Sequence, residues 1–173
     1  RFSTRTDTEV VLAAYRRWGT DCVKRFVGMW AFALWDIATQ SLFCSRDRFG
    51  IKPFHYIEEG GRFYFGSEYK ALRCSPLFSA RLNVNQALRG LQLGWNAYHD
   101  ESYYTCVRTL PPASNLYWKD GNFKLERYWD VSTVQDTGGS FADDAERFRE
   151  LFMDSIHLHM RSDVEIGSCL SGG

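Results

Sequence analysis

The stretch Met29-Trp30-Ala31-Phe32-Ala33-Leu34-Trp35 decides the fold, because it is apolar at every position. A half-buried strand alternates apolar and polar residues, whereas a strand covered on both faces is apolar throughout. We therefore predict that residues 29–35 form a strand that is buried on both sides. A strand of that kind calls for helices stacked over its sheet.

Short segments of similar character follow this strand and are separated from one another by turn residues. They lie at residues 42–45, 54–57 and 63–67. Aromatic-rich runs at this spacing are typical of consecutive antiparallel strands. A later pair of segments, residues 114–118 and 123–129, flanks Asp120-Gly121. Because Asp-Gly favours a left-handed backbone, this pair is predicted to form a hairpin.

Helical periodicity precedes the first strand. Thr6 and Glu9 have the spacing of a capping box, and the residues that follow repeat apolar side chains every three or four positions. These signals predict a helix over residues 7–18. A short second helix is expected near residues 21–26.

The character of the chain changes at residues 132–140, which are polar and contain glycine, as expected of a linker between domains. Ser140 is predicted to cap a helix that follows the linker, and residues 164–170 are predicted to form a strand. The predicted organisation is therefore a first domain over residues 1–131, a linker over 132–140, and the start of a second domain over 141–173.

The composition narrows the class of protein. Of the 173 residues, 45% are hydrophobic and 16% are aromatic, which suits a layered globular domain. Lysine plus arginine equals aspartate plus glutamate at 21 each, so no positive excess exists to bind nucleic acid. The longest apolar run is about half of the roughly 20 residues that a membrane-spanning helix needs. We therefore expect a soluble protein that binds neither nucleic acid nor membrane.

The cysteines and histidines give no sign of a metal or redox site. The cysteines are widely spaced, without a C-x-x-C pair: Cys22, Cys44, Cys74, Cys106 and Cys169. We interpret them as reduced core thiols of a cytoplasmic protein. His157 and His159 are two positions apart on a predicted helix, so they point in different directions and cannot share a metal ion. No metal site is predicted.

Two features combine a possible functional role with a plainer structural one. Ser171-Gly172-Gly173 follows a predicted strand, and small residues there let backbone N–H groups approach a phosphate. The tripeptide alone is more typical of an ordinary turn. Asp7 begins the first helix, where a carboxylate can bind an amino group. The same carboxylate also stabilises the positive end of the helix, and that capping role is favoured on the residue alone.

A third feature is the charged stretch Arg46-Asp47-Arg48-Phe49-Gly50-Ile51-Lys52-Pro53 between two predicted strands. It has the residues of an anion site. Paired arginine and aspartate more often fix a loop through hydrogen bonds and ion pairs, however. The structural role is favoured for this stretch.

Taken together, six segments in this order closely resemble glutamine-hydrolysing asparagine synthetases. They are Thr6-Asp7-Thr8-Glu9-Val10-Val11, residues 28–36, residues 46–53, Phe65-Gly66-Ser67-Glu68-Tyr69-Lys70-Ala71-Leu72, Leu110-Pro111-Pro112 and residues 161–173. The resemblance covers nearly the whole chain. It identifies the chain as an internal piece of an enzyme of this family.

The resemblance implies a fold and a reaction. The fold class is α+β, with an incomplete four-layer α-β-β-α sandwich of the Ntn type, followed by the first helix and strand of an α/β ATP pyrophosphatase domain. In this family an N-terminal cysteine attacks the side-chain amide of glutamine and releases ammonia. Aspartate and Mg-ATP form β-aspartyl-AMP, and ammonia then displaces AMP to give asparagine. ATP and Mg²⁺ are the implied co-substrate and ion, and a homodimer remains open.

The resemblance also implies roles for individual residues. Asp7 matches the acidic residue that binds the α-amino group of glutamine, a role that can coexist with helix capping. Leu170, Ser171, Gly172 and Gly173 match the start of the ATP-binding loop. The nucleophilic cysteine is expected upstream of Arg1, so no catalytic residue is assigned and the chain by itself is expected to be inactive.

Two other functions fit the same residues less well. One is a related ATP-dependent synthetase, similar to β-lactam synthetase, in which the glutaminase fold has lost its cysteine; Asp7 argues mildly against it. The other is a non-catalytic assembly domain, which has no need of the terminal Ser-Gly-Gly loop. An upstream Met-Cys-Gly start favours glutamine hydrolysis over both.

Overall fold

The structure is a computed structural model that describes residues 2–94, 99–135 and 138–168. The chain divides into two compact units, Arg1–Thr133 and Val134–Gly173. The first unit holds every strand of the described residues, together with three helices and two short 3₁₀ segments. The second unit holds one helix.

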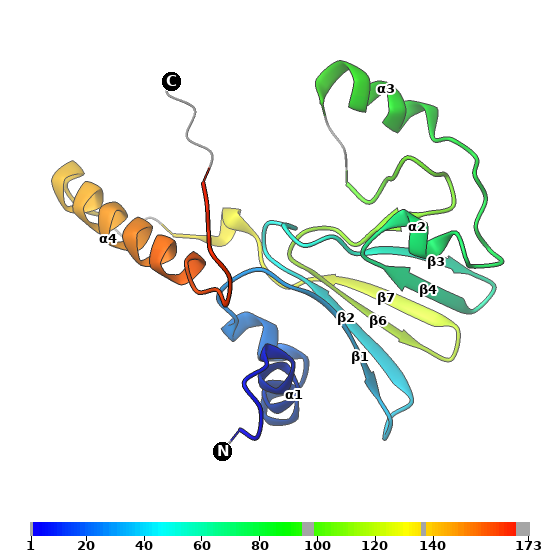
Figure 1. The fold of residues 1–173 in the computed structure, drawn as a ribbon, viewed down its shortest axis with the longest axis horizontal. Coiled ribbons are helices and arrows are strands. Elements are labelled where there is room, and N and C mark those ends of the chain that lie inside the picture. The colour runs from blue at the N-terminus through cyan, green and yellow to red at the C-terminus, as the bar shows by residue number, and fades with distance from the viewer. Residues whose placement is uncertain (1, 95–98, 136–137, 169–173) are drawn as a thin grey trace. The chain divides into compact units, whose positions relative to one another are not determined.

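Two antiparallel sheets make up the first unit. One sheet has the order β1-β2-β6-β7, and the other has the order β4-β3-β5 (Figure 1). The strands of the first sheet are β1 (Ala31–Asp36), β2 (Ser41–Arg46), β6 (Ser114–Lys119) and β7 (Asn122–Arg127). Those of the second are β3 (His55–Glu59), β4 (Arg62–Gly66) and β5 (Arg108–Thr109). This mixture of helices and antiparallel sheets confirms the α+β class.

The β6–β7 hairpin forms where the sequence predicts it. Asp120 and Gly121 have φ angles of 51° and 78°, so both take the left-handed backbone that a tight two-residue turn requires. Lys119 pairs with Asn122 directly across that turn. Turn chemistry thus sets the register of the last two strands of the sheet.

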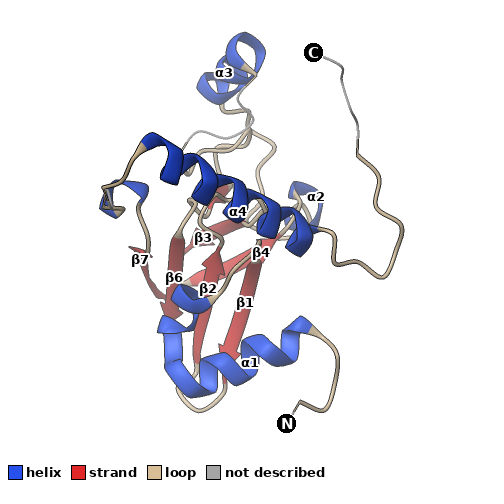
Figure 2. Ribbon diagram, turned by 90° about the vertical axis from the view of Figure 1, so that its left-hand side faces the viewer, coloured by secondary structure: helices blue, strands red, loops and turns tan. Residues whose placement is uncertain are grey.

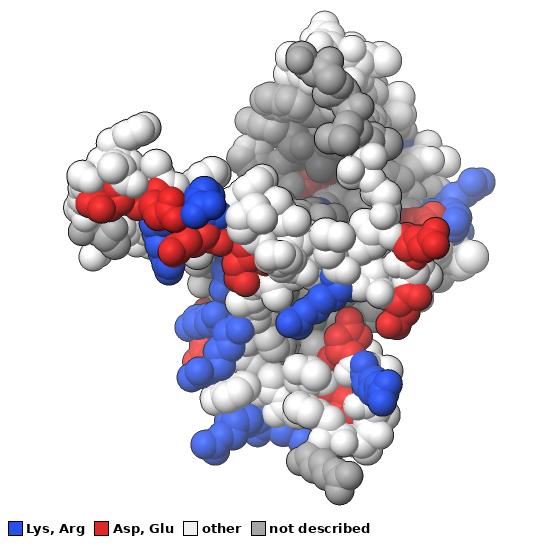
Figure 3. Space-filling view, turned by 60° about the vertical axis from the view of Figure 1, so that its left-hand side comes forward, with Lys and Arg blue, Asp and Glu red and all other residues white. Residues whose placement is uncertain are grey.

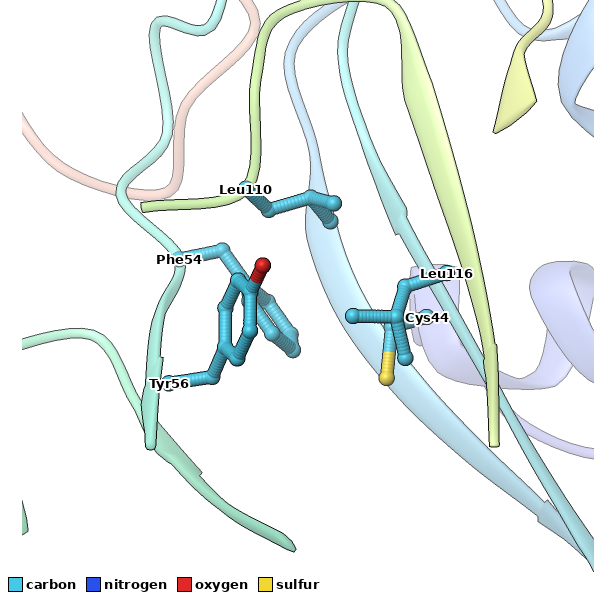
Figure 4. Packing of buried hydrophobic residues seen from close by; sticks show 5 residues of the cluster. All are labelled: Cys44, Phe54, Tyr56, Leu110 and Leu116. Atoms are coloured by element: carbon cyan, nitrogen blue, oxygen red, sulfur yellow. The ribbon is translucent and has the colours of Figure 1, made fainter. Parts of the chain in front are cut away.

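Apolar side chains from the two sheets meet in a common core (Figure 4). Cys44 and Leu116 come from the first sheet, and Tyr56 comes from β3, with Phe54 and Leu110 beside it. All five are at most 4% exposed. Burial of this cluster stabilises the pairing of the sheets, since each fully buried large apolar side chain contributes about 1.5–3 kcal/mol.

The opposite face of the first sheet is covered by α1 (Asp7–Trp18) and the 3₁₀ segment η1 (Gly19–Arg25) (Figure 2). Ala14 of α1 and Val23 of η1 pack around Phe43 of β2. The ring of Phe43 lies 5.7 Å from Tyr15 and 5.4 Å from Tyr117, centroid to centroid. The predicted helix over residues 7–18 is confirmed, and the second helix is a 3₁₀ segment that begins two residues earlier than expected.

Two predictions for this region are wrong. The first strand is not buried on both sides: of its residues only Leu34 is buried, and Trp35 is 46% exposed. The reason is that β1 is an edge strand, which within the described residues pairs with β2 alone. Thr6 and Glu9 do not form a capping box either, because the side chain of Thr6 makes no capping hydrogen bond and Glu9 binds Ser3 and Thr4 instead.

The outer face of the second sheet carries a third apolar cluster, formed by Ile57, Leu72 and Val107. Leu72 belongs to the short helix α2 (Tyr69–Leu72). The helix α3 (Val84–Leu93) follows, and the side chain of Asn83 caps it by accepting a hydrogen bond from the Gln86 backbone. A 3₁₀ turn η2 (Val131–Thr133) ends the unit.

The second unit consists of α4 (Phe141–His159) and the segments that flank it. Ser140 caps the helix in a full capping box with Asp143, which confirms the predicted start. The expected strand over residues 164–170 is not present at residues 164–168, and residues 169–170 lie outside the described part. A strand needs a neighbour to pair with, and the described part of this unit has no other strand.

The charges on the surface and the burial of the cysteines can be compared with the expectations from the sequence. Acidic and basic side chains both occur on the face drawn in Figure 3, in keeping with the zero net charge. Cys22 and Cys44 are buried free thiols, as expected, whereas Cys74 is exposed and Cys106 is half-buried. Cys169 lies outside the described residues. Among the helices of the described ranges, none has the length and apolar character to cross a membrane.

Candidate functional site

A groove of about 550 Å³ runs between α1 and the open edge of β1. Its lining comes from three parts of the chain: Asp7, Thr8, Val11 and Leu12 of α1; residues 29–35 of β1 and its approach; and Lys52, Pro53 and Ser67. Seven consecutive residues around β1 line it, and successive side chains of a strand point to opposite faces. The groove therefore follows the edge of the strand rather than one face of the sheet.

Asp7 lines this groove as the first residue of α1. It is exposed, and its carboxylate makes no hydrogen bond or ion pair with the described part of the chain. The preceding residue, Thr6, has an extended backbone with φ −91° and ψ 144° and gives the helix no side-chain cap. A carboxylate in the first turn of a helix interacts favourably with the positive end of the helix dipole. Asp7 is thus an accessible anion with its hydrogen-bonding capacity unused.

Glu9 fixes the chain that leads into the helix. Its carboxylate accepts hydrogen bonds from the backbone N–H and hydroxyl groups of Ser3 and Thr4, at 2.6–2.8 Å. These bonds, the backbone N–H of Ser3 foremost, lower the pKa of Glu9 to about 2. The sequence predicted that Glu9 caps the helix. In the structure its side chain instead binds the segment that precedes α1.

The floor of the groove is apolar and aromatic. Trp30 donates its indole N–H to the hydroxyl of Ser45 at 3.1 Å, and its ring lies 6.2 Å from that of Tyr128. Phe32 and Phe43 meet edge to face at 5.7 Å. An accessible carboxylate beside a rigid apolar floor suits a small ligand that has an amino group at one end and an uncharged chain.

Two charges of opposite sign line the groove. Lys52 and Asp7 both belong to the lining, and no ion pair joins them in the described structure. Sequence reasoning singled out Asp7 and missed Lys52, Pro53 and Ser67 as groove residues. The signal was available, because these three lie in the segments 46–53 and 65–72 that carry the family resemblance.

The described cysteines do not supply a nucleophile to this groove. Burial raises the pKa of the Cys44 thiol and that of the Cys22 thiol. Both thiols are therefore weak nucleophiles, because the thiolate is the reactive form. Cys74 and Cys106, like the other two, are absent from the lining. His55 is a poor base as well, since burial first and the charge of Arg46 second lower its pKa to about 4.

The second predicted site lies outside the described residues. Leu170, Ser171, Gly172 and Gly173, the expected ATP-binding residues, are all in the segment 169–173 that the structure does not describe. Within residues 2–94, 99–135 and 138–168, no cluster of three or more His, Cys, Asp or Glu side chains is arranged to hold a metal ion. The structure therefore bears on the first site alone.

Comparison with known proteins places both parts of the chain. A family model described as glutamine amidotransferase domain matches residues 1–129, and one described as asparagine synthase matches residues 147–173. The asparagine synthetase [glutamine-hydrolyzing] 3 of Bacillus subtilis is 36% identical over 173 residues, which cover 100% of this chain and 28% of that protein.

Other relatives agree. A putative asparagine synthetase [glutamine-hydrolyzing] 2 of Methanocaldococcus jannaschii is 35% identical over 98% of this chain and 33% of its own length. The asparagine synthetase B [glutamine-hydrolyzing] of Escherichia coli is 30% identical over 100% of this chain and 26% of its own length. The chain thus spans between about a quarter and a third of these curated relatives.

These relatives confirm the resemblance to glutamine-hydrolysing asparagine synthetases that the sequence motifs indicate. The first family model accounts for 129 of the 173 residues, and those residues build the two sheets, α1 and the groove. The chain belongs to the glutamine amidotransferase domain family.

Proposed function

We propose that this chain is part of a glutamine-dependent asparagine synthetase and that the groove beside α1 is its glutamine site. The observation that carries the proposal is the unpaired carboxylate of Asp7 in the lining of a largely apolar groove, within a glutamine amidotransferase domain. Glutamine has a cationic amino group and an uncharged side chain, so it matches both features of the groove. In this proposal Asp7 accepts hydrogen bonds from the α-amino group of glutamine.

The proposed reaction couples two sites. A cysteine expected upstream of Arg1 attacks the side-chain amide of glutamine, forms a thioester and releases ammonia; water then frees glutamate and restores the thiol. At the second site aspartate reacts with ATP to give β-aspartyl-AMP and pyrophosphate. Ammonia displaces AMP from this intermediate and yields asparagine.

The second unit supports the ATP-dependent half of the proposal, because residues 147–173 match the asparagine synthase family. We propose that Leu170, Ser171, Gly172 and Gly173 begin the loop that binds ATP, and that Mg²⁺ accompanies the nucleotide. The proposed boundaries are those expected from the sequence: a glutaminase domain over 1–131, a linker over 132–140, and an ATP pyrophosphatase-type domain from 141.

The finer fold assignment is also a proposal. Two facing antiparallel sheets, with α1 over one outer face and α2 over the other, support an Ntn-type four-layer sandwich. A cytoplasmic location is proposed from the biosynthetic reaction. We also propose a homodimer, which sedimentation velocity of the full-length protein tests.

Product analysis of the full-length protein tests the proposed reaction. With glutamine, aspartate, ATP and Mg²⁺, we expect glutamate, asparagine, AMP and pyrophosphate to form in equal amounts. An ATP-dependent reaction that does not consume glutamine, and in which an amine of the substrate itself closes a ring, indicates the β-lactam synthetase alternative. No ATP-dependent product under any of these conditions contradicts the proposal and favours an assembly domain.

A further inference from the structure

Arg46 and Asp47 are adjacent buried charged residues, and the proposed reaction assigns no role to either of them. Arg46 is 8% exposed and Asp47 is 1% exposed. Burying two charges has a large desolvation cost, which is offset only when hydrogen bonds satisfy both groups. The partners of these two side chains therefore show what the buried charges hold in place.

The carboxylate of Asp47 binds the backbone of the loop that follows it. It accepts hydrogen bonds from the N–H groups of Phe49 at 3.1 Å, Ile51 at 3.0 Å and Lys52 at 3.0 Å. Three such bonds fix the loop in one conformation, because each one adds a directional constraint to a short, closed turn. The loop ends at Lys52 and Pro53, which line the groove.

The guanidinium of Arg46 binds the same loop from its other side. It donates to the carbonyl oxygens of Lys52 at 2.7 Å, Gly50 at 2.6 Å and Leu110 at 2.6 Å. The backbone N–H of Lys52 is thus held by one buried charge and its carbonyl oxygen by the other. Lys52 is consequently fixed on both sides of its Cα atom.

Close packing around Gly50 restricts the backbone of this loop. Gly50 has a φ of +64°, and a Cβ atom placed there lies 2.8 Å from Cγ of Pro112 and 3.1 Å from Cζ of Arg46. Gly50 N–H donates to the carbonyl oxygen of Asp47 at 3.1 Å, and Ala113 N–H donates to the same oxygen at 2.9 Å. The loop is therefore tied to the segment that enters β6.

A second residue of the groove lining is bound to the backbone of Asp47. The backbone N–H of Asp47 donates to the carbonyl oxygen of Trp30 at 2.9 Å, and Trp30 lines the groove just before β1. Asp47 thus contacts the backbone of Trp30 through its own N–H group and the backbone of Lys52 through its carboxylate. These two contacts fix the positions of two lining residues relative to each other.

We propose that Arg46 and Asp47 are positioning residues of the glutamine site, which act by holding Lys52 in the position relative to Trp30 that a bound glutamine requires. The inference rests on the proposed function, since it assumes that the groove is the glutamine site. Neither side chain lines the groove, so both act through the backbone of the residues that do. The charged stretch that sequence reasoning kept structural thereby gains a role in substrate binding.

The test is the KM for glutamine of the full-length protein with Asp47→Asn. The amide keeps the size of the side chain but presents an NH₂ group to backbone donors, so at least one loop bond is lost. We expect KM for glutamine to rise about tenfold, because a tenfold change is comparable in free energy to the loss of one hydrogen bond to a charged group. Ammonia-dependent synthesis should stay within about twofold of the wild type.

Two more variants keep the test decisive. Arg46→Lys retains the charge but loses the planar fork that reaches three carbonyl groups, and it should raise KM for glutamine in the same way. Asp36→Asn is the matched control, because Asp36 accepts backbone hydrogen bonds from Ala38 at 2.9 Å and Thr39 at 3.2 Å in a turn at the far end of β1. KM for glutamine should not change in the control.

The results of these measurements distinguish a failure of the positioning role from a failure of the proposed function. A wild-type protein that releases no glutamate from glutamine defeats the proposed function itself. A wild-type protein that does so, with an unchanged KM in both Asp47→Asn and Arg46→Lys, overturns the positioning role alone. An equal loss of glutamine-dependent and ammonia-dependent activity, together with a lower melting temperature, also overturns it, because that pattern marks a purely structural pair.

Discussion

The two units bury their apolar residues to very different degrees. In the first unit, Leu110, Leu116 and Tyr56 are 0% exposed, and they belong to one of three separate apolar clusters. In the second unit, α4 contains no buried residue, and its aromatic side chains Phe148 and Phe152 are 68% and 54% exposed. Both units have apolar residues at regular spacing, but only the first encloses them.

The difference shows which interactions hold each unit. The sandwich is stabilised by burial, which removes apolar surface from water. The helix α4 depends on local interactions: the Ser140–Asp143 capping box and the ion pairs Arg147–Glu150 and Arg149–Glu146. Exposed ion pairs of that kind contribute only a few tenths of a kcal/mol each. Substitutions in the two units should therefore differ in size and in kind.

The largest expected effect is that of a core truncation in the sandwich. Leu116→Ala removes a side chain that is 0% exposed, and we expect it to lower the free energy of unfolding by about 2–5 kcal/mol. Leu151→Ala on α4 removes a side chain that is 54% exposed, and it should change the first unit by less than about 0.5 kcal/mol.

Tryptophan fluorescence during urea unfolding of the 173-residue chain measures this difference, because all six tryptophans precede residue 134. Equal destabilisation by the two substitutions contradicts the difference between the units, since it shows that α4 is part of the folded core of the first unit.

A smaller effect should appear in the pH dependence of the first unit. His55 contacts Thr109 at 3.0 Å and lies 4.4 Å from the ring of Tyr69. Burial lowers its pKa from the ordinary value of 6.5 to about 4. Between these two values the unfolded state binds more protons than the folded state, so stability rises with pH. The contribution is complete above about pH 6.5 and is lost as the pH falls toward 4.

His55→Gln should flatten the plot of unfolding free energy against pH in that window. The slope for one proton is at most about 1.4 kcal/mol per pH unit, and partial solvent exposure reduces it. His157→Gln, on the exposed helix α4, is the matched control and should leave the plot for the first unit unchanged. A wild-type slope that persists in His55→Gln contradicts the burial of this imidazole.

The smallest effect concerns the cap of α4. Ser140→Ala removes the side chain that accepts a hydrogen bond from the Asp143 backbone, and it should cost the helix about 1 kcal/mol. Far-UV circular dichroism should show less helix while tryptophan fluorescence stays the same. Ser155→Ala, which places a better helix former inside α4, should instead raise the helical signal slightly. A changed fluorescence in either variant means that the units do not respond separately.

Local signals in the sequence predict much of this fold. The β6–β7 hairpin follows from Asp120-Gly121, and the start of α4 follows from Ser140, because turn chemistry and helix caps depend on a few neighbouring residues. The predicted burial of residues 29–35 fails for the converse reason. Whether an apolar strand is central or at the edge depends on which strands pair with it, and that is a tertiary property.

The candidate site shows the same division. Asp7 was found through its place in a family motif, and its position at the start of α1 followed from helical periodicity. Lys52 and Ser67 were missed, because they reach the groove only when the loop after β2 and the end of β4 come together beside α1. The hydrogen bonds of Arg46 and Asp47 were likewise hidden, since one of the Arg46 partners is Leu110, 64 positions along the chain.

The most direct test of the account is the glutamine dependence of a full-length protein in which Asp7 is replaced by alanine. Loss of a charged partner for the α-amino group should raise KM for glutamine about tenfold to a hundredfold, while ammonia-dependent synthesis stays near the wild-type rate. Asp21→Ala, another exposed carboxylate in a first helical turn and outside the groove, should change neither activity. An unchanged KM for glutamine in Asp7→Ala, or an equal fall in both activities, contradicts the assignment of this groove as the glutamine site.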